Sequence, residues 1–516
     1  MTPGKTKAIA FVGFMGAGKT AAARATAKAL GEPAIDVDNS IEAKLGCSIA
    51  TVFERDGEAE FRRIEEELTL ELLAEGGVLS LGGGAIESER VRSALDQHVV
   101  AWCRVSEEEA WRRSRGTGRP LAAERSDFQE RFLRRRPLYE QACVANLPEG
   151  GGVVGREAAP WLAALRGVDG VRLAWALSDP RSYPAAVGAG ALSLLDEQSV
   201  REAMPARLFA IADRDALAHH RGVLPATEAT LELESSGTSK TLTEAERLLR
   251  ELASAGARRD DGILAFGGGV VGDLAGFCAS SYQRGVPVIQ VPTTLVAQVD
   301  AAYGGKTGVD LPEAKNYVGA YHPPTAVLAD PRLLATLPTE ELAAGFAEVL
   351  KTALIAGGPL WERVRSLETL DPPGLDEIIF ACAVTKLDVV AGDERDLGRR
   401  AVLNLGHSVG HALEAATGYT QLRHGEAVGL GMLAALRLSG AAELREEVAE
   451  ILSRHGLPAR LDADVSVDAV LSALDRDKKR TAEGVAFVLL ERPGEPREGQ
   501  QVEPAEVRAS IAELMA

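Results

Sequence analysis

A glycine-rich segment near the start of the chain has the residue types and spacing of a phosphate-binding loop. It reads Gly13-Phe-Met-Gly-Ala-Gly-Lys-Thr20 and lies between an apolar run and a helical stretch. In such a loop backbone N–H groups surround phosphate oxygens, the lysine neutralises them and the hydroxyl can hold Mg²⁺. We therefore expect a nucleoside triphosphate and Mg²⁺ to bind at Gly13, Gly16, Ala17, Gly18, Lys19 and Thr20.

Two acidic residues follow this loop, in the segment Asp36-Val37-Asp38. We expect the segment to end the next strand, where alternation would place both carboxylates on the same side. One carboxylate could then reach Mg²⁺ through water, and the other could orient a substrate hydroxyl. The alternative is an acidic turn on the surface.

Three of the eight histidines lie close together, between residues 407 and 424. His407 and His411 are four residues apart and share a helix face, and His424 stands at the start of the next predicted helix. Glu348 is a candidate carboxylate ligand from an earlier helix. Two histidines and a carboxylate leave a position open on Zn²⁺, as catalysis requires. Any one of these histidines alone could be a core or capping residue, but the group predicts a metal centre.

The glycines of GGGVVGDLAGF (267–277) would allow the backbone to approach a pyrophosphate closely. Their spacing is not GxGxxG, so by spacing alone a dinucleotide site and a plain glycine-rich turn stay equally open.

These candidate sites need a framework of strands and helices. Apolar runs alternate with helical stretches over the first part of the chain, which predicts a parallel sheet covered by helices. We expect strands at 8–14, 77–81 and 98–104 and a helix at 19–30. The glycine-rich segment 147–160 is expected to be the loosened end of this domain, with a boundary near 165–172.

A second α/β section follows, and helical periodicity dominates from about residue 338. We expect strands at 173–177, 208–213, 262–269 and 286–294, then helices at 340–355, 374–391 and 425–440. The fold class is therefore α/β, with three domains. These are a P-loop domain with a parallel sheet (1–168), an α/β nucleotide-binding domain (169–337) and a mostly helical metal-binding domain (338–516).

Composition limits the class of protein. The chain has 516 residues, of which 46% are hydrophobic and 26% charged, the mix of a globular protein with more than one domain. Its net charge of −18 argues against general nucleic-acid binding. Five scattered cysteines indicate reduced thiols. No apolar run is long enough for a membrane span and the N-terminal run ends in Lys19, so we expect a cytoplasmic enzyme.

Four more segments follow the phosphate loop: GEAEFRRIEEE (57–67), LSLGGGAI (79–86), GRPL (118–121) and RRRPLYEQ (134–141). In this order they resemble shikimate kinase, over about residues 8–145. The resemblance implies that shikimate is bound by Asp38, Arg62, the backbone of Gly82, Gly83 and Gly84, and Arg135, which would hold its carboxylate. It also implies that Asp36 lies near Mg²⁺ and that Arg119, on a lid, reaches the phosphates. Arg134 and Arg136 are expected to be solvated.

The segment YQRGVPVIQVPTTLVAQVDAAYGGKTGVDLPEAKNYVGAYHPP (282–324) resembles 3-dehydroquinate synthase, and the likeness extends from about residue 170 to the end. The resemblance implies NAD⁺, a divalent metal (Zn²⁺ or Co²⁺), and conversion of a seven-carbon keto-sugar-acid phosphate (DAHP) into 3-dehydroquinate. It makes Glu348, His407 and His424 the metal ligands and leaves His411 for proton transfer or the phosphate side.

The same resemblance assigns the remaining positions. NAD⁺ would be held by Asp213, Lys240, Gly268, Gly269, Asp273, Thr293, Thr294 and Thr336, with Lys306 and Lys315 beside it. The substrate would be held by Lys306, Asn316, Lys351, Lys386, Arg400, Asn404 and one of Lys478 and Lys479. Arg284 would reach the substrate across a homodimer interface. A substrate with a carboxylate and a phosphate explains a cation cluster in an acidic protein.

One position departs from the family pattern. The segment SSGTSK has Gly237 where the family has a glutamate that contacts the adenosine ribose. Three alternatives remain: another sugar-phosphate cyclase, of the valiolone or inosose type; a polyol dehydrogenase, which would lack the cation cluster; and a first half that only senses nucleotides. Asp38, Arg62 and Arg135 argue against the sensor, because a sensor needs no second substrate.

Overall fold

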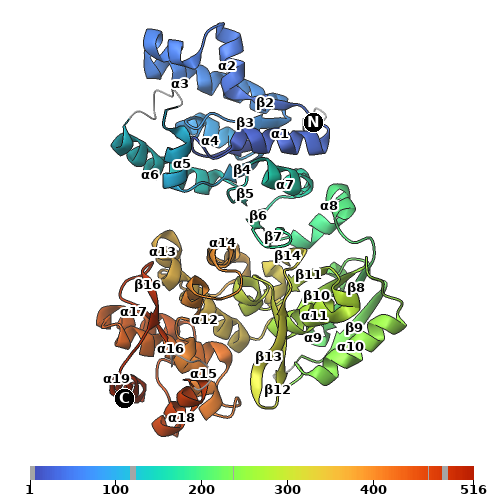
Figure 1. Ribbon diagram of the computed structural model, residues 1–516, viewed down its shortest axis with the longest axis vertical. Coiled ribbons are helices and arrows are strands. Elements are labelled where there is room, and N and C mark those ends of the chain that lie inside the picture. The colour runs from blue at the N-terminus through green and yellow to red at the C-terminus, as the bar shows by residue number, and fades with distance from the viewer. Residues whose placement is uncertain (1–5, 117–123, 236–237, 463, 479–485, 516) are drawn as a thin grey trace. The chain divides into compact units, whose positions relative to one another are not determined.

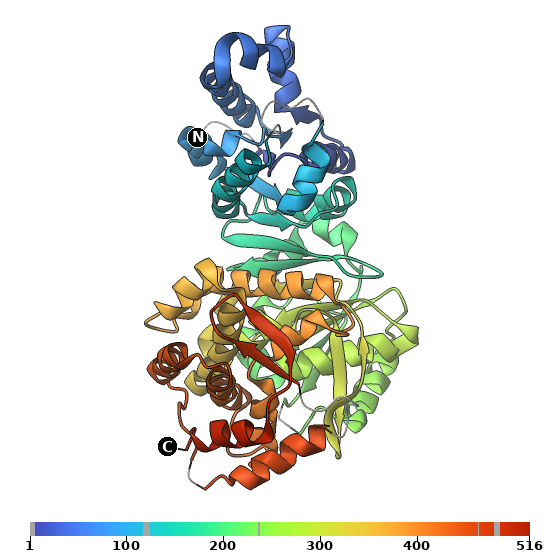
Figure 2. The same ribbon diagram turned by 60° about the vertical axis from the view of Figure 1, so that its left-hand side comes forward.

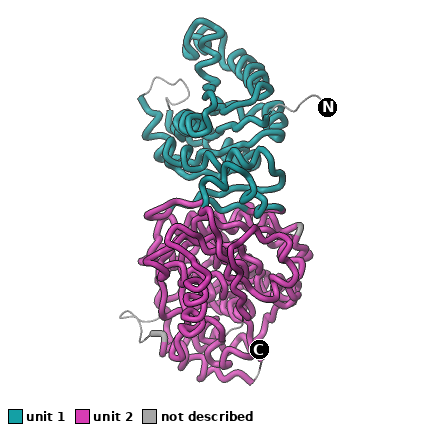
Figure 3. The backbone as a smooth tube through the Cα atoms, turned by 90° about the vertical axis from the view of Figure 1, so that its right-hand side faces the viewer, with its two compact units in different colours: residues 1–177, 184–186, 190–204 teal, residues 178–183, 187–189, 205–516 magenta. Residues whose placement is uncertain are grey.

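The computed structural model describes residues 6–116, 124–235, 238–462, 464–478 and 486–515. The chain forms two compact units, drawn in teal and magenta in Figure 3. The first holds residues 1–177 and the second residues 205–516. The segment between them, with β7 (Tyr183–Gly188), η3 (Ala191–Asp196) and α8 (Gln198–Ala203), is divided between the two units.

The first unit is built on a parallel sheet with the strand order β2-β3-β1-β4-β5-β6. Its core strand β1 has the sequence IAFV and is entirely buried, as expected for a strand covered on both faces. Figure 1 labels the elements. The strands are β1 (Ile9–Val12), β2 (Ala34–Asp36), β3 (Val78–Ser80), β4 (Val99–Cys103), β5 (Ala145–Leu147) and β6 (Val171–Ala176).

Helices surround this sheet and supply the apolar side chains that bury it. They are α1 (Lys19–Leu30), α2 (Val37–Leu45), α3 (Ile49–Glu75), η1 (Ala85–Glu87), α4 (Glu89–Leu95), α5 (Glu107–Ser114), α6 (Arg125–Ala142) and α7 (Gly152–Ala164). The helix predicted at 19–30 and the strands predicted near 8–14, 77–81 and 98–104 are confirmed, the strands with shorter ends.

Two predictions for the first unit are wrong. The strand β2 ends at Asp36, whose carboxylate accepts from the N–H of Asn39 and so starts helix α2; Asp38 therefore lies in the first turn of a helix, not on the strand. The segment 147–160 is also not a loosened end, because helix α7 begins at Gly152. Gly155 lets α7 approach α1 so closely that a Cβ there would lie 2.5 Å from the Ala22 oxygen.

The second unit contains a parallel sheet with the order β14-β11-β10-β8-β9. Because all five strands run the same way, their carboxyl ends share one edge. The bounds are β8 (Leu208–Asp213), β9 (Ala229–Leu233), β10 (Gly262–Gly267), β11 (Val288–Pro292) and β14 (Ala326–Ala329). The associated helices are α9 (Arg214–His220), η4 (Arg221–Val223), α10 (Leu242–Ser254), α11 (Gly269–Ser281), η5 (Tyr282–Arg284), η6 (Ala297–Ala301) and η7 (Pro331–Thr336).

From Thr339 onward the second unit is mainly helical, as predicted. Its helices are α12 (Thr339–Ala356), α13 (Gly358–Arg365), η8 (Pro372–Gly374), α14 (Asp376–Gly392), η9 (Arg399–Asn404), α15 (His407–Ala416), α16 (His424–Leu438), α17 (Ala442–Arg454), α18 (Val467–Lys478) and α19 (Pro504–Ala512).

Two antiparallel hairpins complete the second unit. The first pairs β12 (Lys306–Leu311) with β13 (Ala314–Tyr321). The second pairs β15 (Phe487–Leu490) with β16 (Pro496–Gln500); it is red in Figure 2 and packs against α16 and η9. The prediction of helices to the end of the chain missed this second hairpin.

Within the part of the chain that the structure describes, no helix combines the length and the apolar character needed to span a lipid bilayer.

Candidate active sites

The phosphate loop lies between β1 and α1 and is shaped by its glycines. Gly13 has φ +144° and Gly18 has φ +84°, and a Cβ on Gly13 would lie 2.5 Å from the carbonyl oxygen of Cys103. Glycine is required there because side chains rarely adopt such backbone conformations. Lys19 donates to the Phe14 carbonyl at 3.1 Å, and the Thr20 hydroxyl donates to Asp36 at 2.8 Å. The expected Mg²⁺ residues Thr20 and Asp36 are therefore in direct contact.

Polar side chains gather where α3 meets the loop after β3. Arg62 donates to Glu65 at 2.5 Å, and Glu65 is buried. A Cβ on Gly82 would collide with Glu65 and lie 3.0 Å from Asp38, and one on Gly84 would collide with the Arg62 guanidinium. The glycines thus bring together the side chains that the sequence singled out.

Glu65 itself was missed, although its position three residues after Arg62 on one helix was a usable signal. Burial raises the pKa of the Glu65 carboxyl, and Arg62 opposes that shift.

Arg135 occupies the buried side of α6 and is 1% exposed. Its guanidinium donates to one oxygen of Glu87 at 2.6 and 2.9 Å. Burial raises the pKa of Glu87, but the hydrogen bonds from Arg135 outweigh it and leave the pKa lowered. Arg134 and Arg136 are exposed, as predicted. Arg119 lies outside the described residues.

Residues expected to hold NAD⁺ gather at the carboxyl edge of the second sheet. Asp213 ends β8 and caps α9, accepting from the Ala216 N–H at 2.8 Å. Gly268 follows β10 and is the N-cap of α11, and Gly269 begins that helix. Thr293 and Thr294 follow β11, and Thr336, at the end of η7, contacts His220 of α9 at 2.7 Å. The open end of a helix beside glycine backbone suits a pyrophosphate.

Lys240 links this edge to the β12–β13 hairpin. Its ammonium group lies 2.9 Å from Asp273 and 3.7 Å from Asp310 and also contacts the side-chain oxygen of Asn316. The N–H of Asn316, which has φ +56°, donates to Asp310 at 2.6 Å. Asp310, which the sequence analysis missed, therefore fixes two predicted residues. Gly237 lies outside the described residues.

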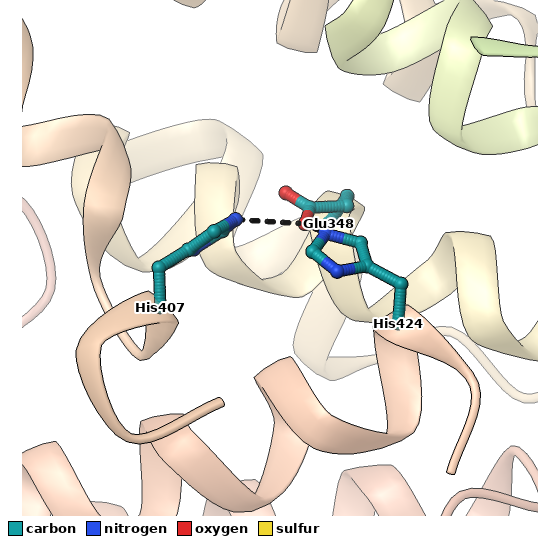
Figure 4. A group of neighbouring side chains, drawn as sticks. All are labelled: Glu348, His407 and His424. Atoms are coloured by element: carbon teal, nitrogen blue, oxygen red, sulfur yellow. Dashed lines mark ion pairs between the residues drawn. The ribbon is translucent and has the colours of Figure 1, made fainter. Parts of the chain in front are cut away.

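Glu348, His407 and His424 converge from three helices, α12, α15 and α16 (Figure 4). The Nε2 atoms of His407 and His424 lie 3.5 and 3.3 Å from Glu348 Oε1. Gly425 permits this approach, because a Cβ there would collide with the backbone of Ala344 on α12. The three potential ligand atoms all lie within 4.8 Å of one another.

The chemistry of this set fits a divalent metal ion. Glu348 is 0% exposed; its Oε2 atom pairs with the ammonium group of Lys351, and neither of its oxygens accepts a hydrogen bond of good geometry. Burial raises the pKa of Glu348, but Lys351 and the histidines lower it to about 2, so the carboxylate is ionised. Burial, together with Lys351, lowers the pKa of His407 to about 3 and keeps that imidazole neutral. Burial lowers the pKa of His424, but its hydrogen bonds to Glu348 and Glu414 outweigh burial and raise the pKa to about 9, so a bound metal ion would displace that proton. A buried carboxylate and imidazole nitrogens are zinc ligands.

Three cations of the second unit are buried, and one of them, Lys351, pairs with Glu348. Lys351 and Lys386 both contact Asp300. The ammonium group of Lys351 lies 3.2 Å from the Asp300 carboxylate. The ammonium group of Lys386 pairs with the same carboxylate and also donates to the backbone carbonyl of Asp300 at 2.6 Å. Burial raises the pKa of Asp300, but the two lysines hold it well below its usual range. Arg400 is 3% exposed and donates to the carbonyls of Glu394 and Gly304. The sequence analysis missed Asp300, although it lies within the segment that carried the family resemblance.

The remaining predicted residues are mostly exposed. Lys306 pairs with Asp396, and Lys315 lies 3.3 Å from Glu414. His411 packs against His407 and His424, with ring centroids 5.2 and 6.0 Å apart. Asn404 and Arg284 are exposed, and Arg284 has φ +70°. Lys478 ends α18, and Lys479 lies outside the described residues.

These two constellations define the classes of protein: a P-loop kinase, and a metal-binding domain beside a nucleotide-binding sheet. The shikimate kinase family model matches residues 15–153. The models of the N-terminal and C-terminal domains of 3-dehydroquinate synthase match residues 230–344 and 345–480.

Individual relatives support the match to 3-dehydroquinate synthase. The 3-dehydroquinate synthase of Symbiobacterium thermophilum is 40% identical over 355 residues, which cover 64% of this chain and 98% of the relative. That of Gloeobacter violaceus is 43% identical over 296 residues, 56% of this chain and 81% of the relative. A solved 2-deoxy-scyllo-inosose synthase with carbaglucose-6-phosphate, NAD⁺ and Co²⁺ is 27% identical, with a TM-score of 0.59, covering 66% of this chain and 99% of its own.

The chain belongs to the 3-dehydroquinate synthase family, and it carries an N-terminal shikimate kinase domain ahead of the synthase. This confirms the resemblance to shikimate kinase and to 3-dehydroquinate synthase that the sequence motifs indicated.

Proposed function

We propose that the protein is a bifunctional enzyme of aromatic amino acid biosynthesis. One activity is the ATP- and Mg²⁺-dependent phosphorylation of shikimate; the other is the NAD⁺- and metal-dependent cyclisation of DAHP to 3-dehydroquinate with release of phosphate. The family memberships of the two halves support this assignment. We assign residues 1–168 to the kinase, 169–337 to the NAD⁺-binding domain and 338–516 to the metal- and substrate-binding domain.

In the kinase, the loop backbone and Lys19 bind the ATP phosphates, and Thr20 and Asp36 bind Mg²⁺. Arg135 and Arg62 bind the shikimate carboxylate, since a guanidinium can hold a carboxylate with two hydrogen bonds. Asp38, beside Gly82, orients the attacking hydroxyl and receives its proton. Arg119 assists at the transferred phosphate. Positioning and electrostatics are what phosphoryl transfer needs from a protein.

In the synthase, the observation that supports this assignment is the set of three buried cations, Lys351, Lys386 and Arg400, of which Lys351 pairs with Glu348. A group of buried positive charges suits a substrate with a carboxylate and a phosphate. When bound at the carboxyl edge of the second sheet, NAD⁺ would supply a hydride acceptor and donor, and a divalent metal held by Glu348, His407 and His424 would supply a Lewis acid. Lys306, Asn316 and Asn404 contact the substrate, as does one of Lys478 and Lys479, and His411 moves protons on the phosphate side.

The test compares substrates on the full-length protein. With NAD⁺ and Zn²⁺, we expect phosphate release from DAHP and at least about 10²-fold lower kcat/KM for sugar phosphates that lack a carboxylate, because the charged hydrogen bonds between that carboxylate and the buried cations would be lost. Equal turnover of a sugar phosphate without a carboxylate would instead indicate a cyclase of the inosose or valiolone type. Phosphorylation of shikimate by ATP tests the kinase separately.

The homodimer and the cytoplasmic location are part of the same proposal. The exposed guanidinium of Arg284, held at φ +70°, supports a role at an interface between copies. Mixing a protein that carries Arg284→Ala with one that carries Lys351→Ala tests it: a restored fraction of synthase activity is expected if active sites share residues across the dimer. Absence of restoration, with sedimentation showing monomers, would contradict it.

A further inference from the structure

The two histidines of the metal centre have different hydrogen-bond partners at Nδ1, the ring nitrogen that faces away from Glu348. Both direct Nε2 toward Glu348. The Nδ1 atom of His407 lies 3.3 Å from the carbonyl oxygen of Leu405, whereas the Nδ1 atom of His424 lies 3.4 Å from the carboxylate of Glu414. An imidazole that donates its Nδ1 proton leaves the Nε2 lone pair available for a metal. The backbone therefore fixes one ligand and a side chain fixes the other.

Glu414 is well placed for this role. Glu414 lies on α15 and is 5% exposed. The carboxylate oxygen that does not face His424 lies 3.3 Å from the ammonium group of Lys315. Lys315 in turn lies 4.0 Å from the centroid of the Tyr419 ring. The carboxylate is thus held between a cation from the β12–β13 hairpin and the imidazole of α16, so it cannot easily turn away from His424.

We propose that Glu414 is a positioning residue of the metal centre: by accepting the Nδ1 proton of His424 it fixes the tautomer and ring orientation of that ligand. The proposal rests on the metal site described above. Carboxylates behind histidine ligands raise the basicity of the imidazole, and their loss weakens metal binding about 10- to 100-fold.

Glu414 could alternatively be a ligand itself, because one oxygen of Glu414 and one nitrogen each of His411 and His424 also lie within 4.8 Å of one another. Glu348 is the better ligand on geometry, since it is fully buried and faces two histidines at once. The two arrangements predict different consequences for metal affinity.

The experiment measures the Zn²⁺ dissociation constant of the full-length protein by competition with a chromogenic chelator. Glu414→Gln keeps an acceptor oxygen but loses the charge, and we expect about 10-fold weaker binding. Glu414→Leu loses both, and we expect about 100-fold. The control is Glu426→Gln, which removes a charge from the same turn as His424; Glu426 contacts Arg423 rather than His424. We expect less than about 2-fold change there.

A second readout separates positioning from general damage to the fold. In the Co²⁺-substituted protein, Glu414→Leu should shift the visible absorption bands of the metal, whereas Glu426→Gln should leave them unchanged. Wild-type affinity and spectrum in both Glu414 variants would overturn the inference. Loss of Zn²⁺ as complete as in Glu348→Ala would also overturn it, by making Glu414 a ligand. Wild-type affinity in Glu348→Ala would instead refute the proposed metal centre.

Discussion

The two active regions of this chain use different groups to bind negatively charged substrates. In the kinase, eight consecutive residues, from Gly13 to Thr20, supply backbone N–H groups and one lysine. In the synthase, Lys351, Lys386 and Arg400 come from α12, α14 and η9 and are buried. The first site depends on local backbone shape, and the second depends on packing distant segments together.

Both regions contain buried cations that pair with carboxylates, although Arg400 donates to backbone carbonyls instead. Arg135 is paired with Glu87 in the kinase, while Lys351 and Lys386 share Asp300 in the synthase. Charges are costly to bury, and the loss of one partner leaves an uncompensated charge. A synthase site with two lysines on one carboxylate should therefore be more sensitive to a single substitution than the kinase loop.

The largest expected difference concerns metals. A strong chelator should abolish cyclisation, and after dialysis Mg²⁺ alone should restore shikimate phosphorylation but not cyclisation. The reason is that the proposed ligands beside Glu348 are histidine nitrogens, which Zn²⁺ prefers and Mg²⁺ does not. Both activities are assayed on one sample. Full synthase activity in protein that contains only Mg²⁺ would mean that the two regions do not differ in this way.

Lys19→Ala should reduce phosphoryl transfer about 10²- to 10³-fold, the usual cost of removing one preorganised charged donor. Phosphate release from DAHP should be unchanged, because Lys19 belongs to the other compact unit. Asp38→Asn is a companion variant that should lower kcat while ATP still binds. Parallel loss of both activities in either variant would contradict two independent sites.

Asp300→Asn tests the sensitivity of the synthase site directly. It would leave Lys351 and Lys386 close together without their shared negative charge. We expect a loss of about 3 kcal/mol in local stability, at the lower end of the range for breaking a buried pair because the Asp300 side chain is 20% exposed. Hydrogen exchange of α12 and α14 should speed up while α1 is unchanged.

A matched variant is Asp388→Asn, an exposed carboxylate on α14, which should change exchange little. If Asp300→Asn and Asp388→Asn have the same effect, the lysines do not depend on Asp300.

The same contrast explains how much the sequence could predict. The phosphate loop, the i,i+4 histidines and apolar core strands such as β1, β8, β10 and β11 were predicted because each is a local pattern. Asp38 was assigned to a strand because the sequence does not show that Asp36 caps a helix. Asp300 and Glu414 were missed because their roles come from lysines and a histidine brought close only by packing. Helix α7 was missed because its glycines, read as loop residues, serve close packing against α1.

The smallest expected effect concerns the attachment of α7. Arg166, just after α7, donates to both oxygens of Glu32, just after α1, with one contact at 2.9 Å. The side chains are 13% and 29% exposed, so Glu32→Gln should lower the free energy of unfolding by about 1 kcal/mol. Glu71→Gln, which removes an exposed partner of Lys44, is the control and should cost less.

The pH dependence has a definite sign. The hydrogen bond from Arg166 lowers the pKa of Glu32 below 4.5, although burial opposes it. A carboxyl with a lowered folded-state pKa stabilises the fold above its unfolded-state pKa and loses that contribution as the pH falls. The difference between wild type and Glu32→Gln should therefore be constant from pH 6 to 8 and shrink below about pH 4.5. The free energy of unfolding of each protein is measured at each pH by urea titration, with proteolytic cleavage of the α7 segment as the signal for unfolding. A difference that persists undiminished at low pH would show that Glu32 acts through packing and not through its charge.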